Sequence, residues 1–181
     1  MEQRAPFRPG PRLQWLLQAD RHYSNKLRYA EKPGRLRRLA IFLAHSGDSW
    51  FWGLGLAAVW LLSGPYGKWY AVRLVLAIIG LALLVFLIKR AFKRQRPKGE
   101  WGAIYRKTDP HSFPSGHAAR MVMLAVLAAA LGPAWLAWLL LVWAPLVALA
   151  RVAMGVHYLS DVFGGALLGL VVGLALVIVW H

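Results

Sequence analysis

Apolar residues gather into five long stretches of the chain. They lie at about 40–62, 69–89, 117–132, 134–151 and 161–180. Most of these stretches reach the roughly 17–25 residues that an α-helix needs to cross the hydrocarbon core of a bilayer. In the last stretch Gly165, Gly169 and Gly173 recur every fourth residue, a spacing that lets membrane helices pack closely. The pattern predicts an all-α integral membrane helical bundle with about five transmembrane helices.

The first apolar stretch is less regular than the others. His45, Ser46, Asp48 and Ser49 interrupt its early part. We therefore expect the lipid-buried portion to begin near Ser49, with the preceding turns at the membrane surface.

The N-terminal residues 1–38 are polar and basic. Leu13, Leu16, Leu17, Tyr23 and Leu27 approximate a helical stripe, which is interrupted at Asp20 and is typical of a helix lying on a bilayer surface. A solvated tail fits the same residues equally well. We divide the chain into this basic tail or interfacial helix, residues 1–38, and a transmembrane domain, residues 39–181.

Composition supports the membrane interpretation. Of the 181 residues 59% are hydrophobic, and 22 Lys and Arg against 7 Asp and Glu give a formal charge of +15. A soluble nucleic-acid binder would carry this charge throughout its fold, whereas here long uncharged stretches separate it, so no nucleic-acid partner is expected. The aromatic content of 13% excludes a disordered chain. With no Cys, thiolate chemistry is also excluded.

The positive charges are unevenly distributed between the two membrane faces. Five spans place residues 1–38, 90–116 and 151–160 on one face, and the other face carries only Lys68 and Arg73. Since cytoplasmic loops are enriched in Lys and Arg, the crowded face is predicted to be cytoplasmic in a multi-pass cell-membrane protein.

A histidine and an aspartate stand at the border of the last two stretches. If the turn is helical, His157 and Asp161 are four residues apart on one face, where the carboxylate can orient the imidazole and leave its other nitrogen free to react. Arg151 precedes them at the end of a span. A simple interfacial hydrogen bond is the alternative for this pair.

Residues 114–117, Pro-Ser-Gly-His, open the third stretch. Ser115 can cap the helix, and the free N–H groups around Gly116 form a natural seat for an anion, which His117 would overlook. A capped helix with a surface histidine is the alternative.

Two cations follow the second stretch. If its helix continues through Lys89, then Lys89 and Arg96 point to one locus about two turns long, and Pro97 ends the helix. Both can bind phosphate oxygens, although anchoring in the headgroup layer is the alternative for any cation at a helix end. Headgroup or solvent contact is expected for their neighbours Arg90, Lys93, Arg94 and Lys98.

Together these groups describe a phosphate pocket with a nucleophile and a proton donor. No metal-binding motif occurs, because acids are few and His117 and His157 belong to separate segments. We therefore expect phosphoryl transfer without a metal or another cofactor.

Three motifs resemble those of the type 2 phosphatidic acid phosphatase superfamily, which includes lipid phosphate phosphatases. They are Lys-x6-Arg-Pro at Lys89 to Pro97, Pro-Ser-Gly-His at 114–117, and Arg-x5-His-x3-Asp at Arg151, His157 and Asp161. Two features depart from the family pattern. Ala150 replaces the usual Ser, which removes a hydroxyl donor, and membrane members commonly have six spans where five are counted here.

The resemblance implies a mechanism and a class of substrate. His157 would attack phosphorus and become phosphohistidine, Asp161 would orient it, and His117 would protonate the leaving oxygen. The phosphate ligands would be Lys89, Arg96, Arg151, Ser115 and the Gly116 N–H. The implied substrate is a lipid phosphate or diphosphate drawn from the surrounding membrane lipids, such as phosphatidate, phosphatidylglycerophosphate, or a polyprenyl phosphate or diphosphate.

Three other functions fit parts of the pattern: a vanadate-dependent oxidase, whose known members are soluble, an anion transporter, and a catalytically silent lipid-phosphate-binding relative. The ionisable residues collect at one face and not at mid-bilayer, which disfavours the transporter. No feature of the sequence fixes the oligomeric state.

Overall fold

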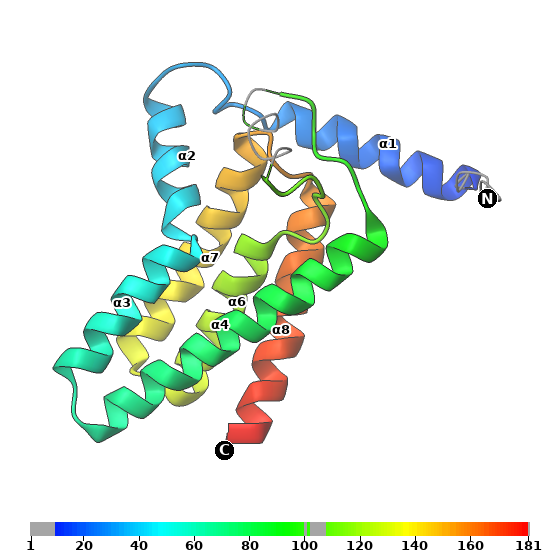
Figure 1. Ribbon diagram of the computed structural model, residues 1–181. Helices are drawn as coiled ribbons and strands as arrows, with labels where there is room; N and C mark the ends of the chain where they lie inside the picture. Colours follow the sequence, from blue (N-terminus) through cyan, green and yellow to red (C-terminus); the bar gives the residue numbers. More distant parts are fainter. Residues whose placement is uncertain (1–9, 100, 102–107, 181) are drawn as a thin grey trace.

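A computed structural model describes residues 10–99, 101 and 108–180 of the chain (Figure 1). This part contains seven helices and no strand. They are α1 (Pro11–Lys26), α2 (Arg35–Ser46), α3 (Ser49–Leu62), α4 (Pro65–Phe92), α6 (Gly116–Leu131), α7 (Ala134–Ala153) and α8 (Leu159–Trp180). The all-α membrane bundle expected from the apolar pattern is confirmed.

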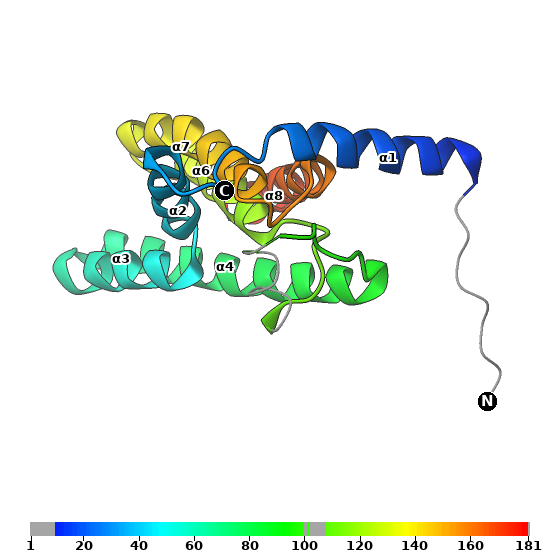
Figure 2. The same cartoon turned by 90° about the horizontal axis from the view of Figure 1, so that it is seen from above.

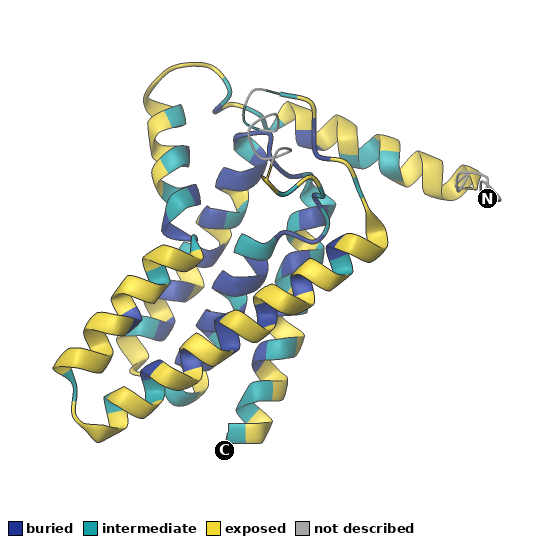
Figure 3. Cartoon of the chain, in the orientation of Figure 1, coloured by how far each residue is buried: buried dark blue, intermediate teal, exposed yellow. Residues whose placement is uncertain are grey.

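The bundle is built around α6, which packs against both α7 and α8. Viewed from above, α3 and α4 form a second layer beside these three helices (Figure 2). Buried residues concentrate on α6, while the outward faces of α3, α4 and α7 expose large apolar side chains (Figure 3). Extensive apolar exposure of this kind is expected for helices surrounded by lipid.

The glycine stripe of α8 allows this helix to pack closely on α6. Gly165, Gly169 and Gly173 are buried. A Cβ at the first two would overlap the backbone carbonyl oxygens of Ser115 and Ala119 on α6. The close packing predicted from the four-residue spacing is confirmed, and it holds the beginnings of α6 and α8 together.

The lengths of the helices limit which of them can cross a membrane. Three helices, α4, α7 and α8, are long and apolar enough to cross a membrane. By contrast α3 and α6 have 14 and 16 residues. At a rise of 1.5 Å per residue, α6 is about 24 Å long, less than the roughly 30 Å of a hydrocarbon core.

The first apolar stretch, 40–62, is not a single helix. The stretch is divided into α2 and α3, with a break at Gly47 and Asp48. Side chains from α6 hold this break, because Arg120 donates to the Gly47 carbonyl oxygen and His117 bonds to the Asp48 carboxylate. The later portion, α3, begins at Ser49 as expected.

Of the two alternatives left open for the N-terminal segment, the structure has the helix, α1, which lies across the end of the bundle where α8 begins (Figure 1). Asp20, which interrupts the apolar stripe, faces α8: its Oδ1 accepts the Ser160 N–H at 3.0 Å. Ser24 Oγ accepts the Leu159 N–H at 2.9 Å. Thus α1 supplies the polar groups that cap α8. The division at residues 38 and 39 remains a prediction.

Candidate active site

One cavity of about 220 Å³ lies where α4, α6 and α7 meet the loop before α8. Most of the residues predicted for the site line it: Lys89, Arg96, Gly116, His117, Arg151 and His157. The other two lie just outside its lining, Ser115 at the N-cap of α6 and Asp161 beside His157. The structure therefore brings the distant motifs together around one space.

The cations Lys89 and Arg96 reach the cavity by different routes. Because α4 ends at Phe92 and Lys93 adopts a left-handed conformation (φ 48°), the expectation that one helix carries both cations is wrong. The chain turns back, and Arg96 Nη2 binds Asp109 Oδ2 at 2.7 Å. Lys89 Nζ donates to the same carboxylate. Asp109 therefore neutralises part of the positive charge that a phosphate would meet.

The N-terminus of α6 forms another part of the cavity wall. Ser115 is fully buried, and its N–H donates to the Asp161 carbonyl oxygen at 2.9 Å. Its hydroxyl makes no hydrogen bond within the described part of the chain. A buried hydroxyl without a partner costs free energy, so this group is available for a bound anion. Gly116 lines the cavity beside it at the positive end of the helix dipole.

The hydrogen bonds of His157 define its reactive nitrogen. Arg96 Nη1 lies 3.1 Å from His157 Nε2 and 2.9 Å from the Val156 carbonyl oxygen. A guanidinium can only donate, so Nε2 must accept with its lone pair, and the ring proton of neutral His157 must lie on Nδ1. The nucleophilic lone pair consequently faces the cations that would hold a phosphate.

The protonation state of His157 is that of a nucleophile. Its side chain is buried. Burial lowers the pKa of His157 well below its ordinary value, and the nearby charges of Arg96, Arg151 and Lys89 lower it further. The imidazole is therefore neutral near pH 7 and retains its lone pair for attack.

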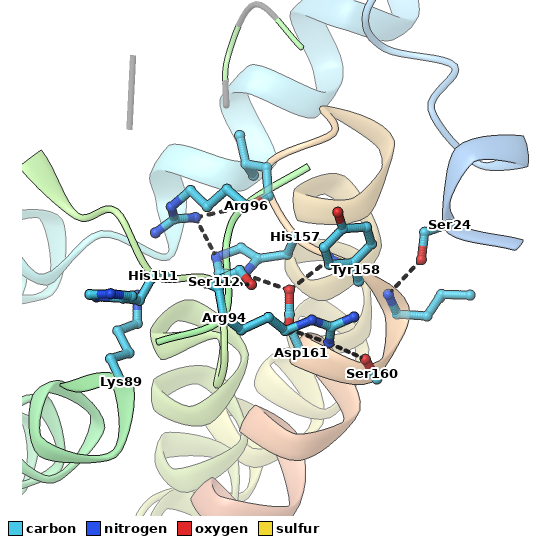
Figure 4. Close-up of polar contacts among 12 residues, drawn as sticks. Ser24, Lys89, Arg94, Arg96, His111, Ser112, His157, Tyr158, Ser160 and Asp161 are labelled. Atoms are coloured by element: carbon cyan, nitrogen blue, oxygen red, sulfur yellow. Dashed lines mark hydrogen bonds and ion pairs between the residues drawn. The ribbon is translucent and has the colours of Figure 1, made fainter. Parts of the chain in front are cut away.

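Asp161 lies on the other side of the imidazole (Figure 4). Its Oδ2 is 3.6 Å from His157 Nδ1, an electrostatic contact longer than a hydrogen bond. Arg94 Nη1 donates to Oδ1 at 2.7 Å, and the Tyr158 N–H donates to Oδ2 at 2.8 Å. These bonds fix a fully buried carboxylate beside the nitrogen that carries the proton.

His117 faces the cavity from the first turn of α6. Its Nε2 lies 2.6 Å from Asp48 Oδ1 in the break between α2 and α3. Arg151, from the last turn of α7, is 1% exposed and lines the same cavity. The space is thus bounded by two imidazoles and several cations.

Ala150 does not belong to the cavity lining. It packs instead in a cluster with Ala40 and Ala44 of α2 and with Met154. Ala150, which stands in place of the family's usual serine, therefore makes an apolar contact between α7 and α2.

Several residues of the site were not singled out from the sequence. Asp109 and Arg120 line the cavity, and Asp48 contacts His117. The expected headgroup or solvent contact of Arg94 is wrong, because its side chain is 18% exposed and joins Asp161 to Asp20 of α1. Asp48 had a usable signal, since an acid inside an apolar membrane stretch is a functional candidate.

Among the described residues, no three His, Cys, Asp or Glu side chains converge as a set of metal ligands. The groups that can hold an anion are the cations, the Ser115 hydroxyl and the start of α6. A reaction without metal remains a prediction.

Comparison with known proteins identifies the family. A profile of the PAP2 superfamily matches residues 70–181. A decaprenylphosphoryl-5-phosphoribose phosphatase of Mycobacterium tuberculosis is 37% identical over 145 residues, covering 79% of each chain. An undecaprenyl-diphosphatase of Sulfolobus acidocaldarius is 31% identical over 138 residues, covering 74% of this chain and 66% of the relative.

The fold agrees with this assignment. The crystal structure of a transmembrane PAP2-type phosphatidylglycerolphosphate phosphatase from Bacillus subtilis superposes with a TM-score of 0.73 at 25% identity, covering 90% of this chain and 84% of that one. Residues 70–181, which the family profile matches, include every motif that lines the cavity. The chain is a membrane protein and belongs to the PAP2 superfamily.

Proposed function

We propose that the protein is a membrane lipid phosphatase that hydrolyses a lipid phosphate or diphosphate through a phosphohistidine at His157, without a metal. The observation that carries this proposal is the buried Nε2 lone pair of His157, 3.1 Å from Arg96 in a cavity that also contains His117. Relatives named as phosphatases of lipid and polyprenyl phosphates support it.

In the first step His157 Nε2 attacks phosphorus. A nitrogen–phosphorus bond forms while the bond from phosphorus to the leaving oxygen breaks, and protonated His117 gives its proton to that oxygen. Lys89, Arg96 and Arg151 neutralise the phosphoryl oxygens as their charge redistributes. The lipid alcohol, or the lipid phosphate in the case of a diphosphate, then departs.

In the second step water attacks the phosphohistidine. His117, now neutral, takes a proton from the water, the oxygen joins phosphorus and the nitrogen–phosphorus bond breaks. Inorganic phosphate leaves, while His157 regains its lone pair and His117 its proton. Asp161 stabilises the positive charge that forms on the imidazole of His157 during both transfers.

The cavity favours recognition of the headgroup phosphate over recognition of the tail. At about 220 Å³ it is smaller than the roughly 300–1,000 Å³ of pockets that enclose whole ligands. Leu81, Val85 and Phe86 of α4 continue its lining with apolar groups, suited to the first carbons of a lipid. Phosphatidate, phosphatidylglycerophosphate, and polyprenyl phosphate or diphosphate are therefore the substrates to examine first.

We further infer that the protein crosses the cell membrane several times, with the catalytic end on the cytoplasmic side. The concentration of Lys and Arg near that end supports this orientation. Since the chain has no Cys, a single Cys at Lys98 can be labelled without background. An impermeant thiol reagent should leave it unmodified in intact cells and modify it after permeabilisation; modification in intact cells would place the site outside.

The enzymatic proposal is tested by phosphate release from a lipid-phosphate panel, using purified protein in detergent with a chelator present. We expect turnover that vanadate inhibits, a loss of about 10²–10⁴-fold in His117→Ala, and no detectable turnover in His157→Ala. His22→Ala, which changes an exposed histidine on α1, is the matched control and should retain full activity. Binding of lipid phosphates without any turnover would instead indicate a catalytically silent relative.

A further inference from the structure

The break between α2 and α3 lies directly against the first turn of α6. A Cβ at Gly47 would stand 2.8 Å from Val147 Cγ1 and 3.1 Å from His117 Cδ2, so only glycine allows this approach without a shift of its neighbours. Arg120 of α6 donates to the Gly47 carbonyl oxygen. Trp52 Nε1 donates to the Ser46 carbonyl oxygen at 3.1 Å. Asp48, which follows Gly47, is thereby brought against His117, a residue that lines the phosphate cavity.

Both oxygens of the Asp48 carboxylate are held. Oδ1 lies 2.6 Å from His117 Nε2, and Oδ2 lies 2.8 Å from His45 Nδ1 and 3.2 Å from Trp50 Nε1. Burial raises the pKa of Asp48, but the hydrogen bonds from His117 and His45 outweigh burial and hold that pKa well below its ordinary value. Asp48 is therefore a carboxylate at any pH at which the enzyme would work.

An ionised carboxylate only accepts hydrogen bonds, so His117 Nε2 must carry a proton. In neutral His117 the lone pair then lies on Nδ1, which is the nitrogen left to exchange a proton with the substrate or water. His157 has the opposite arrangement, with its lone pair on Nε2. The two imidazoles thus each have one nitrogen next to a carboxylate and one available for chemistry.

We propose that Asp48 is a positioning residue for the general acid: it holds His117 through Nε2, so that Nδ1 gives the proton to the leaving oxygen and later takes one from water. The proposal rests on the proposed role of His117 in phosphate-ester hydrolysis. The three sequence motifs do not include Asp48, which lies 69 residues before its partner.

The charges around His117 show why a carboxylate is needed there. Arg120 on the same helix and Arg151 on α7 both lie near it, and Lys89, Arg96 and His157 share its cavity. Burial and these positive neighbours both disfavour an imidazolium, whereas the contact with Asp48 favours it. Asp109 also lines the cavity, but its carboxylate is bound to Lys89 and Arg96. Asp48 is thus the acid in direct contact with His117, and it stabilises the protonated ring that the first step consumes.

The test compares two synthetic substrates that share the same alkyl tail. One is an alkyl phosphate, whose alkoxide needs a proton to leave, and the other is an alkyl-substituted nitrophenyl phosphate, whose phenolate leaves without one. The value of kcat/KM reports only the steps up to phosphorylation of His157, so it isolates proton donation to the leaving group. For Asp48→Asn we expect kcat/KM to fall about 10- to 100-fold on the alkyl phosphate, part of the roughly 10²–10⁴ that a general acid supplies, and by less than about threefold on the nitrophenyl phosphate.

A purely structural role would lower kcat/KM equally on the two substrates, and that result would overturn the proposal. Trp50→Phe is the matched control, because it removes a hydrogen bond to the same carboxylate without touching His117. It should leave both values within about twofold, as expected for a bond at an exposed edge.

A double-variant comparison separates this proposal from the proposed function. In the His117→Ala background, adding Asp48→Asn should have no further effect on kcat/KM, because the residue through which Asp48 acts is gone. A further loss on the alkyl phosphate would show that Asp48 acts by another route and would refute the proposal. If His117→Ala alone retained full activity, the proposed mechanism itself would fail.

Discussion

Arg94 provides a quantitative test of how the N-terminal helix is joined to the candidate active site. Its guanidinium binds Asp161 Oδ1 at 2.7 Å, Asp20 Oδ2 at 2.5 Å and Ser160 Oγ at 2.5 Å. It also stacks over the Tyr158 ring at 4.3 Å from the centroid. Arg94→Met would remove the shared cation while retaining an apolar side chain of comparable length.

The free energy of unfolding lost in Arg94→Met can be judged from the burial of the ion pairs that it breaks. Asp161 is fully buried, and the side chains of Asp20 and Arg94 are 12% and 18% exposed. Removing one partner of a buried ion pair costs about 3–5 kcal/mol, and partial exposure reduces this to about 2–4 kcal/mol here. For a chain of this size, a loss of 3 kcal/mol corresponds to a decrease of about 6–12 °C in the thermal midpoint.

Activity should fall as well, because Asp161 loses the cation that holds Oδ1 in place. We expect kcat to decrease by about 10- to 100-fold, comparable with the loss of other groups that orient a catalytic side chain. The assay is thermal unfolding in detergent together with phosphate release. Arg90→Met is the matched control, since Arg90 is exposed and contacts only the Phe86 ring among the interactions described. If Arg94→Met and Arg90→Met gave the same midpoint and the same kcat, the inferred link from α1 through Arg94 to Asp161 would be wrong.

Three further predictions concern packing, the phosphate site and pH. Ser115→Ala removes a buried hydroxyl that has no partner in the described part of the chain, so thermal stability should stay unchanged or rise by about 1 kcal/mol. Inhibition by inorganic phosphate should nevertheless weaken. A variant that lost thermal stability and phosphate inhibition together would contradict this assignment. Gly169→Ala should lower the thermal midpoint and activity together, because its Cβ would overlap the backbone of α6, whereas Gly80→Ala has open space and should behave as wild type; equal midpoints for the two variants would refute the packing. The pKa of Asp20 is raised by burial but lowered more strongly by bonds from Ser160 and Arg94, so its stabilising effect is complete above the ordinary carboxyl range and is lost as pH falls below about 4. The difference in thermal midpoint between wild type and Asp20→Asn should therefore shrink as the pH falls below about 4, and a constant difference would exclude the ionic contribution.

Local sequence was sufficient to locate the apolar helices α4, α6, α7 and α8 and most of the candidate site. The apolar stretches that became α4, α6, α7 and α8 are recognisable because each is long and uninterrupted. Ser115 and His117 are predictable as neighbours of an anion because the start of a helix has free N–H groups, a property of the local segment. Such features need no knowledge of the rest of the fold. The capping bond expected of the Ser115 side chain is not formed, and its hydroxyl has no partner in the described part of the chain.

The features that the sequence did not predict depend on contacts between distant segments of the chain. Asp48 and His117 are 69 residues apart, and nothing in either segment indicates the other as its partner. The break that separates α2 from α3 depends on Arg120 reaching Gly47 from another helix. Arg94 faces the bundle because the chain reverses at Lys93, whereas a continued helix would have placed it differently.

The identity of the nucleophile is the central claim, and a rapid-quench experiment tests it most directly. Protein is mixed with a lipid phosphate carrying a radioactive phosphoryl group, quenched in base within a turnover, and digested for peptide mapping. The predicted result is a base-stable, acid-labile label on the peptide that contains His157, formed and consumed at rates compatible with turnover. Steady hydrolysis of the lipid with no label on His157, or with the label on another residue, would contradict it.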